Sequence, residues 1–363
     1  MTRDELQGIA AHRLAKSRRV VCQWATGTGK TNVALKFLAA NPWMNCLILV
    51  PEQNNIENWT YEFEKFGVPM LSVQIACYAS FHKFKNTKWD LLVFDEAPHV
   101  DTDKRKKICE TVKADYVLAL GAVLADEELS MLESVYGKFE VSKISLSDAI
   151  QQGILPPPQV KVVHLQLDDT DLSFRAQGRL CTAKGYYNYL NRKVEEAVTA
   201  YNQVSNEFNR RRMLTAGNTR KRFLGSQKQA AIRRLCTELE KHGKRFLCFC
   251  SSIQQAEELG GDRAFTSKSA KSLKHLGRFN NHEIDSLFVV GKLIEGQNLR
   301  DINCGVIGQI GGTSRITVQQ CGRIMRSENP VIYVPIFDGT KDDSFLYTLT
   351  SNISKDYIQH YKF

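Results

Sequence analysis

The sequence contains no hydrophobic segment long enough to cross a membrane. Its longest apolar runs are Cys46–Val50, Leu91–Phe94 and Val331–Phe337, and each is far shorter than the roughly 20 residues that a membrane-spanning helix needs. The N-terminus reads Met-Thr-Arg-Asp-Glu and lacks the apolar region of a secretory signal. We therefore expect neither a membrane protein nor a membrane partner.

Cysteine pairs of the kind that form zinc sites or disulfide frameworks are also missing. The ten cysteines are scattered, no Cys-x-x-Cys pair occurs, and Cys22, Cys46, Cys248 and Cys250 lie inside apolar runs. Buried free thiols are typical of a reducing compartment, and this spacing argues against a zinc site. We expect a cytoplasmic protein.

An excess of positive charge is confined to one part of the chain. The 363 residues include 49 Lys and Arg against 39 Asp and Glu, which gives a net charge of +10. Residues 1–159 and 246–363 are close to neutral, whereas residues 160–245 carry 18 basic and 8 acidic side chains. A near-neutral protein with one basic segment is typical of a chain that binds a polyanion at one place.

Short apolar runs alternate with amphipathic stretches along most of the sequence. Continuously apolar strands separated by helices, such as those expected at 31–40 and 56–66, predict a parallel sheet covered on both faces. The runs form two sets, separated by Pro156–Pro158 and the basic segment, so we expect two α/β lobes, 1–157 and 158–363. The basic segment, about 168–242, reads as a mostly helical insertion at the start of the second lobe. The expected strands are 19–23, 46–50, 71–78, 91–95, 116–120, 245–250, 286–290, 303–310 and 331–337.

A glycine-rich loop, Ala25-Thr-Gly-Thr-Gly-Lys-Thr31, follows the first expected strand and opens a helix. In such loops the backbone N–H groups surround phosphate oxygens, Lys30 reaches the β- and γ-phosphates and the Thr31 hydroxyl ligates Mg²⁺. The strict motif has glycine where this chain has Trp24, but its core is intact. We expect ATP and Mg²⁺ to bind here, on Thr26, Gly27, Thr28, Gly29, Lys30 and Thr31.

Two further groups of residues fit phosphoryl transfer. Asp95 and Glu96 end an apolar strand, where ligands bind in open α/β sheets, so we expect Asp95 to hold Mg²⁺ and Glu96 to orient and deprotonate the attacking water. Arg323 and Arg326 are three residues apart, so both can project from one helix face toward the charge that develops on the γ-phosphate.

Taken in order, these motifs resemble those of superfamily-two DNA helicases and translocases, which have two RecA-like lobes. Gln7 lies 20 residues before Gly27, where the family's Q motif contacts adenine. The style is closest to phage-encoded helicases and to the motor subunits of type I restriction enzymes. The other matches are Val50-Pro51 with Asn58-Trp59, Tyr78-Ala-Ser80, Asp95-Glu-Ala-Pro98, Phe249-Cys-Ser-Ser252, Glu295-Gly-Gln-Asn-Leu299 and Gln319–Arg326.

The resemblance implies an ATP-dependent DNA helicase or translocase that acts in replication, recombination or repair. It implies that ATP sits between the lobes and that the nucleic acid crosses both, with DNA preferred over RNA. We expect a monomer that works with replication or recombination proteins in a bacterial or phage-infected cell. The residues that the resemblance adds are Gln7, Gly296 and Asn298 for the nucleotide, Gln319 for catalysis, and Pro51, Tyr78 and Ser251 for nucleic acid.

Two departures from the family pattern keep other functions open. Motif II ends in Pro98, where many relatives have His or Asp, and the segment Leu120-Gly-Ala-Val-Leu124 lacks the usual hydroxyl groups of motif III. In relatives those groups connect the nucleotide site to closure of the lobes. The alternatives are a nucleic-acid-binding or annealing protein with weak ATPase activity, and an RNA helicase.

The basic segment is interpreted as a nucleic-acid contact, because Lys and Arg neutralise phosphates. Its alternative is a solvated helix face. The tyrosines of Gly185-Tyr-Tyr-Asn-Tyr189 could stack on bases, although core packing is favoured for each of them. The basic residues assigned to the contact are Arg210, Arg211, Arg212, Arg220, Lys221 and Arg222.

Overall fold

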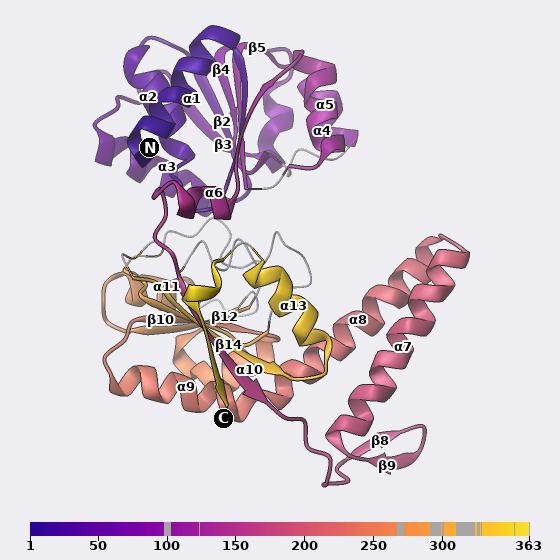
Figure 1. The fold of residues 1–363 in the computed structure, drawn as a ribbon. Coiled ribbons are helices and arrows are strands. Elements are labelled where there is room, and N and C mark those ends of the chain that lie inside the picture. The colour runs from indigo at the N-terminus through magenta and orange to yellow at the C-terminus, as the bar shows by residue number, and fades with distance from the viewer. Residues whose placement is uncertain are drawn as a thin grey trace. The chain divides into compact units, whose positions relative to one another are not determined.

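The computed structural model describes residues 1–97, 103–122, 124–266, 272–290, 299, 301–309, 324, 327, 329–351 and 353–362. The described chain divides into two compact units (Figure 1), one formed by Met1–Pro157 and the other by nearly all described residues from Pro158 onward. Among the described residues, no helix has both the length and the apolar composition that a bilayer crossing requires.

The first unit is built on a parallel sheet with strand order β3-β2-β4-β5-β1-β6. Its central strands are buried because helices pack on both faces of the sheet (Figure 1), as the apolar runs predict. The strands are β1 (Arg19–Trp24), β2 (Cys46–Val50), β3 (Val73–Cys77), β4 (Lys88–Phe94), β5 (Lys113–Gly121) and β6 (Glu140–Ile144). The helices are α1 (Arg3–Ser17), α2 (Thr31–Ala40), α3 (Gln53–Phe66), the 3₁₀ helix η1 (Tyr78–Phe84), α4 (Asp103–Cys109), α5 (Asp126–Tyr136) and α6 (Leu146–Gln151).

Helix α3 shows how the sequence places a buried side chain. Asn55, Trp59 and Phe63 are spaced by four residues and are the buried residues of this helix, since such residues share one face. The helix ends at Gly67, whose φ of 63° is the left-handed conformation that glycine adopts most readily. Trp59 is therefore directed into the unit rather than toward solvent.

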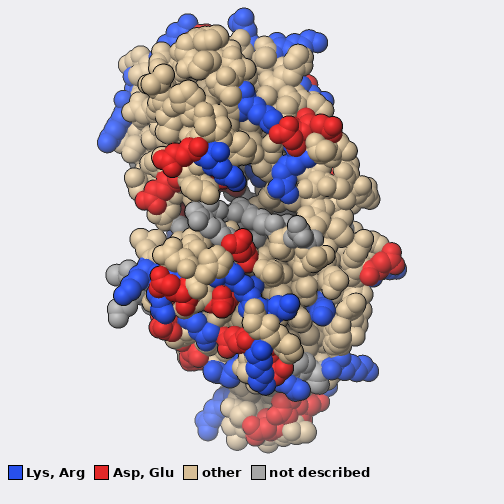
Figure 2. Space-filling view, turned by 90° about the vertical axis from the view of Figure 1, so that its left-hand side faces the viewer, with Lys and Arg blue, Asp and Glu red and all other residues tan. Residues whose placement is uncertain are grey.

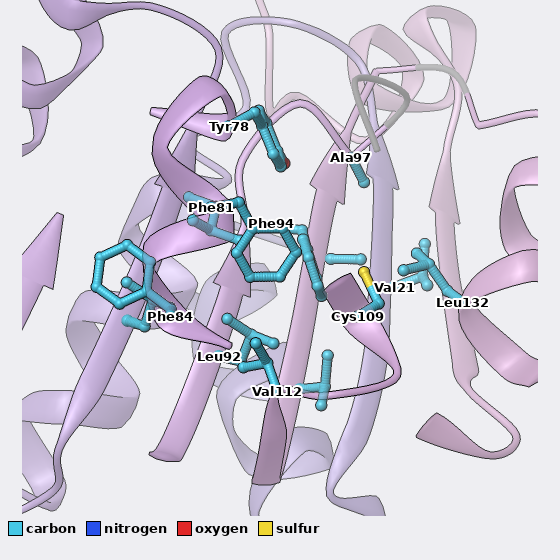
Figure 3. Packing of buried hydrophobic residues seen from close by; sticks show 14 of the residues in the cluster. Val21, Tyr78, Phe81, Phe84, Leu92, Phe94, Ala97, Cys109, Val112 and Leu132 are labelled. Carbon is cyan, nitrogen blue, oxygen red and sulfur yellow. The ribbon is translucent and has the colours of Figure 1, made fainter. Parts of the chain in front are cut away.

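A cluster of aromatic and aliphatic side chains packs on the sheet of the first unit (Figure 3). The rings of Phe81 and Phe94 meet edge to face with their centroids 6.2 Å apart, an arrangement that adds to simple area burial. Tyr78 and Ala97 lie at one end of this cluster (Figure 3). The cluster thereby supports the segment that directly follows β4.

The second unit also has a parallel sheet, with strand order β11-β12-β10-β13-β14-β7-β15. The expected α/β class with two parallel sheets is confirmed. The strands are β7 (Gln159–Leu165), β10 (Phe246–Cys250), β11 (Ala264–Phe265), β12 (Ser286–Val290), β13 (Cys304–Ile307), β14 (Val331–Phe337) and β15 (Ile358–Lys362). The helices on this sheet include α9 (Gln229–Lys241), α10 (Ile253–Gly260), α11 (Ser272–Asn280) and α13 (Lys341–Thr350).

The sequence interpretation placed the basic segment at the start of the second lobe. In the structure, one strand of the second sheet comes before it. Strand β7 follows the triple proline directly and pairs with β14 and β15. The segment therefore enters between β7 and β10. It consists of a small antiparallel hairpin of β8 (Phe174–Ala176) and β9 (Arg179–Cys181), then α7 (Ala183–Gln203) and α8 (Glu207–Gln227).

Helices α7 and α8, here called the arm, form an antiparallel pair that extends from the body of the second unit (Figure 1). Each has 21 residues, which corresponds to a length of about 30 Å. The base of the arm is held by a cluster that includes Tyr187, Leu190, Phe223 and Phe337. Tyr186 stacks on Phe174 in the same region, so these two tyrosines pack as side chains of the fold.

Candidate nucleotide site

The glycine-rich loop connects β1 to the N-terminus of α2. The backbone N–H of Ala25 donates to the carbonyl of Ile144 in β6 at 2.9 Å, which fixes the start of the loop. Gly27 and Gly29 have φ of 93° and 77°, and residues with a Cβ rarely adopt this conformation. The loop therefore leads into α2 with the positive end of the helix dipole directed at the position of a phosphate.

Gln7 in α1 braces the loop. Its side chain is 2% exposed, and its amide Nε2 donates to the carbonyl of Thr28 at 3.2 Å. A Cβ added at Gly29 would lie 2.3 Å from that Nε2, so a larger residue here would displace the Gln7 amide in addition to straining the backbone angle. Gln7 therefore holds the loop in shape, while its contact with adenine remains a prediction.

The polar side chains of the loop fit a bound phosphate. Lys30 Nζ donates to the carbonyl of Trp24 at 3.1 Å, and Thr28 Oγ1 donates to the carbonyl of Ala25 at 2.8 Å. The Thr26 hydroxyl is buried and has no hydrogen-bond partner among the described residues. Buried polar atoms are almost always paired, so this hydroxyl matches an oxygen supplied by a ligand. Thr31 begins α2 directly after Lys30.

Asp95 and Glu96 follow β4 at the same carboxyl edge of the sheet. The N–H of Asp95 continues the ladder by donating to the carbonyl of Leu49 at 2.9 Å. Glu96 has a φ of 49°, which costs about 1–2 kcal/mol for a residue with a Cβ. Such strain clusters at functional sites, where the surrounding structure imposes it.

Two side chains from other elements hold Asp95. The indole Nε1 of Trp59 donates to Asp95 Oδ2 at 2.8 Å, and the hydroxyl of Tyr78 donates to the Asp95 carbonyl at 2.8 Å. Burial, followed by the nearby Glu96 carboxylate, raises the pKa of Asp95 to about 6. The Trp59 hydrogen bond and the charge of Lys30 act in the opposite direction, so Lys30 and Asp95 interact across the site.

The sheet order sets the separation of the two halves of the site. Strand β5 lies between β1 and β4, and neighbouring strands are about 4.8 Å apart, so the loop and Asp95 are about 10 Å apart. The segment Leu120-Gly121 ends β5 between them. A triphosphate extending from the loop toward Asp95 and Glu96 fits this spacing.

The comparisons with known proteins concern the fold that carries this arrangement. The profile of the family described as "Type III restriction enzyme, res subunit" matches residues 2–75, which include Gln7, the loop and α3. The Hef helicase domain of Pyrococcus furiosus is similar over 94% of this chain and 97% of its own, with a TM-score of 0.58 and 12% identity. The chain therefore has the fold of this helicase domain.

A second solved structure with this helicase fold is the ATP-dependent type ISP restriction-modification enzyme LlaBIII bound to DNA. It is similar over 100% of this chain, with a TM-score of 0.58 and 13% identity, but this chain spans 31% of its length. No curated protein sequence matches the chain.

Several residues that the helicase resemblance singled out lie outside the described residues. Ile324, which lies between two of them in sequence, is described. It is buried, and a Cβ at Gly305 in β13 would lie 1.9 Å from its Cδ1, so it packs closely on the second sheet. The residues outside the described part are Pro98, Gly296, Asn298, Gln319, Arg323 and Arg326.

The residues expected to contact nucleic acid on the two sheets differ in exposure. Pro51 is partly exposed and lies two residues before the start of α3. Tyr78 is 2% exposed, so its visible contribution is the hydrogen bond to Asp95. Ser251 follows β10, and its hydroxyl donates to Gln255 Oε1 at 2.9 Å. The contacts of these three residues with nucleic acid remain predictions.

The structure sorts the basic residues of the arm. Arg210 and Arg211 are exposed and share the carboxylate of Glu207, at 3.3 and 3.0 Å. Arg212 and Arg222 are also exposed. Arg220 instead donates to the side chain of Asn191 in α7. Lys221 is partly buried, and desolvation, with the charge of Lys228, lowers its pKa. The exposed cations thus include Arg210–Arg212, near the tip. The face in Figure 2 shows basic and acidic groups interspersed.

Sequence reasoning missed the role of Trp59, although it noted this residue within a weak motif. A buried indole needs a partner for its N–H, and that was the available signal. The partner, Asp95, is 36 residues away, so only the fold identifies it.

Proposed function

We propose that this protein is an ATP-dependent motor that hydrolyses ATP to move along or remodel DNA in replication, recombination or repair. The observation that carries the proposal is the pairing of two halves at one sheet edge. One half is the phosphate loop, in which Gly27 and Gly29 have positive φ and the buried Thr26 hydroxyl has no partner among the described residues. The other is Asp95 and Glu96, held at the end of β4.

The residues divide the chemistry between binding and proton transfer. The loop N–H groups and Lys30 bind the β- and γ-phosphates, and Thr31 and Asp95 are the residues that would hold Mg²⁺, which neutralises phosphate charge when bound. Glu96 accepts a proton from a water molecule whose oxygen forms a bond to the γ-phosphorus. The bond from that phosphorus to the bridging oxygen breaks, and ADP leaves with the electron pair. Arg323 and Arg326 are proposed to stabilise the charge on the transferred phosphoryl group, and Gln319, Gly296 and Asn298 to complete the site.

The arm is proposed as the main contact with nucleic acid outside the two sheets. It carries nine Lys and Arg against three Asp and Glu, and such cations bind the phosphate backbone. Phe208 and Val204 at its tip are 73% and 56% exposed, next to Arg210–Arg212. An exposed aromatic ring beside cations suits an unpaired base.

The test is ATP hydrolysis measured with Mg²⁺ and with single-stranded, duplex, forked or four-way DNA, or with matched RNA. The proposal expects stimulation by DNA and loss of turnover in Lys30→Ala. The matched control is Lys36→Ala, since Lys36 is also in α2 but pairs with Asp4 at 2.7 Å on the surface, where such pairs contribute little. Full turnover in Lys30→Ala would refute the site assignment.

The same assay separates the alternatives. Nucleic-acid binding without stimulated hydrolysis in the wild-type protein would favour a binding or annealing protein with a weak ATPase. Stronger stimulation by RNA than by DNA of the same sequence would favour an RNA helicase.

A further inference from the structure

Asp95 is held from two sides by residues outside its own strand. Trp59 approaches from α3, is 2% exposed, and donates its indole N–H to carboxylate oxygen Oδ2 at 2.8 Å. Tyr78 approaches from η1, is also 2% exposed, and donates its hydroxyl to the backbone carbonyl at 2.8 Å. The first bond orients the carboxylate and the second orients the peptide that carries it.

Both donors are themselves fixed by packing. The Trp59 ring contacts Phe63, one turn further along α3, with centroids 6.2 Å apart. Tyr78 lies in the aromatic cluster with Phe81 and Phe94 (Figure 3). A donor whose own rotamer is locked by its neighbours holds its acceptor more narrowly than a mobile one. The indole bond to Oδ2 thereby restricts how the carboxylate of Asp95 can turn.

We propose that Trp59 is a positioning residue for Asp95, assisted by Tyr78, and that it sets the orientation in which Asp95 takes part in holding Mg²⁺. This inference rests on the proposed function, because it requires Asp95 to act at the metal. Outer partners that orient a metal ligand alter metal affinity or activity by about 10- to 100-fold when removed. Helix α3, which carries Trp59, also begins two residues after Pro51, for which a nucleic-acid contact is predicted.

The experiment compares Trp59→Phe with Trp89→Phe. Trp89 lies in β4, the strand that leads to Asp95, but at the opposite end of that strand. Its indole donates to Thr87 Oγ1 at the same distance of 2.8 Å. Each variant keeps an aromatic ring and loses one indole N–H. Turnover is measured against free Mg²⁺ at saturating ATP and DNA, and nucleotide binding is measured separately in EDTA.

We expect Trp59→Phe to raise the Mg²⁺ concentration for half-maximal turnover about tenfold or more, with nucleotide binding in EDTA unchanged. Trp89→Phe should match the wild type in both measurements. An unchanged Mg²⁺ requirement in Trp59→Phe, or an equal change in both variants, would overturn the inference. Either result means that the indole N–H of Trp59 does not orient Asp95 for Mg²⁺.

Tyr78→Phe serves as a second test if Trp59→Phe fails to fold. It removes only the hydroxyl and should raise the Mg²⁺ requirement in the same direction by a smaller factor, and no change would overturn the inference. Failure of the proposed function looks different, because the wild type and Trp89→Phe would then show no turnover at any Mg²⁺ concentration.

Discussion

A buried ion pair at the base of the arm gives the sharpest test of how the second unit is held together. Lys228, between α8 and α9, lies 2.7 Å from Asp342 in α13, and neither side chain has exposed surface. Gln309 joins both, since it accepts from Lys228 at 3.4 Å and donates to Asp342 at 3.2 Å. The backbone N–H of Phe337 also donates to Asp342, at 3.1 Å.

The magnitude follows from what each substitution leaves behind. Lys228→Met leaves a buried carboxylate, and Asp342→Leu leaves a buried ammonium group, whose pKa is already lowered by desolvation. Removing one partner of a buried pair costs about 3–5 kcal/mol. The double variant leaves no buried charge and retains only the cost of unpaired neutral groups, about 1–3 kcal/mol each. We therefore expect the double variant to cost about as much as one single variant, rather than their sum.

The assay uses the placement of the four tryptophans, which all lie before residue 90 and therefore in the first unit. In urea unfolding, far-UV circular dichroism follows the helices of both units, whereas tryptophan fluorescence follows the first unit alone and serves as an internal reference. With slopes of about 1–3 kcal/mol per molar urea, each single variant should lower the midpoint of the second unit by about 1 M or more. Additive single effects, or a single effect below about 1 kcal/mol, would refute the reasoning.

Three further predictions concern the first unit and the arm. Because the folded-state pKa of Asp95 is raised from 3.8 to about 6, its ionised form reduces stability above pH 6 and has no such effect below about pH 4. Asp95→Asn should thus abolish turnover yet stabilise the first unit at pH 8 by at most about 3 kcal/mol, read from fluorescence, and equal stability at pH 8 would contradict this. Replacing Arg210–Arg212 by glutamine should weaken DNA binding and make its log–log salt slope shallower by roughly 2, while basal hydrolysis survives. An unchanged slope would mean that these arginines only face solvent. Phe208→Ala should weaken single-stranded DNA binding at least about fivefold and leave duplex binding unchanged, as followed by fluorescence of a base analogue, and equal losses on both DNAs would exclude stacking. The control for the Arg210–Arg212 variant neutralises three exposed cations that lie outside the arm, Arg233, Lys241 and Lys244.

Much of the fold could be read from the sequence because central parallel strands are apolar on both faces. β2 and β10, for example, are buried at every position, and an uninterrupted apolar run predicts this directly. The strands that the sequence did not reveal are mostly polar edge strands. β6 and β15 end their sheets, and β15 is exposed at four of its five positions, so no apolar run marks them.

The sequence by itself determined the local chemistry of this protein. The glycines of the phosphate loop, the lysine that follows them and the acidic pair after an apolar strand are neighbours along the chain, so their spacing alone predicts their roles. The same holds for the concentration of positive charge in residues 160–245.

Only the tertiary structure decided which distant residues meet. It joined Gln7 to the loop, Trp59 to Asp95 and Lys228 to Asp342, and it turned Arg220 toward Asn191 rather than toward solvent. These contacts depend on strand order and helix packing, which bring together residues that no periodicity relates. A hydrophobic pattern shows that a side chain is buried, but the folded sheet determines what it is buried against.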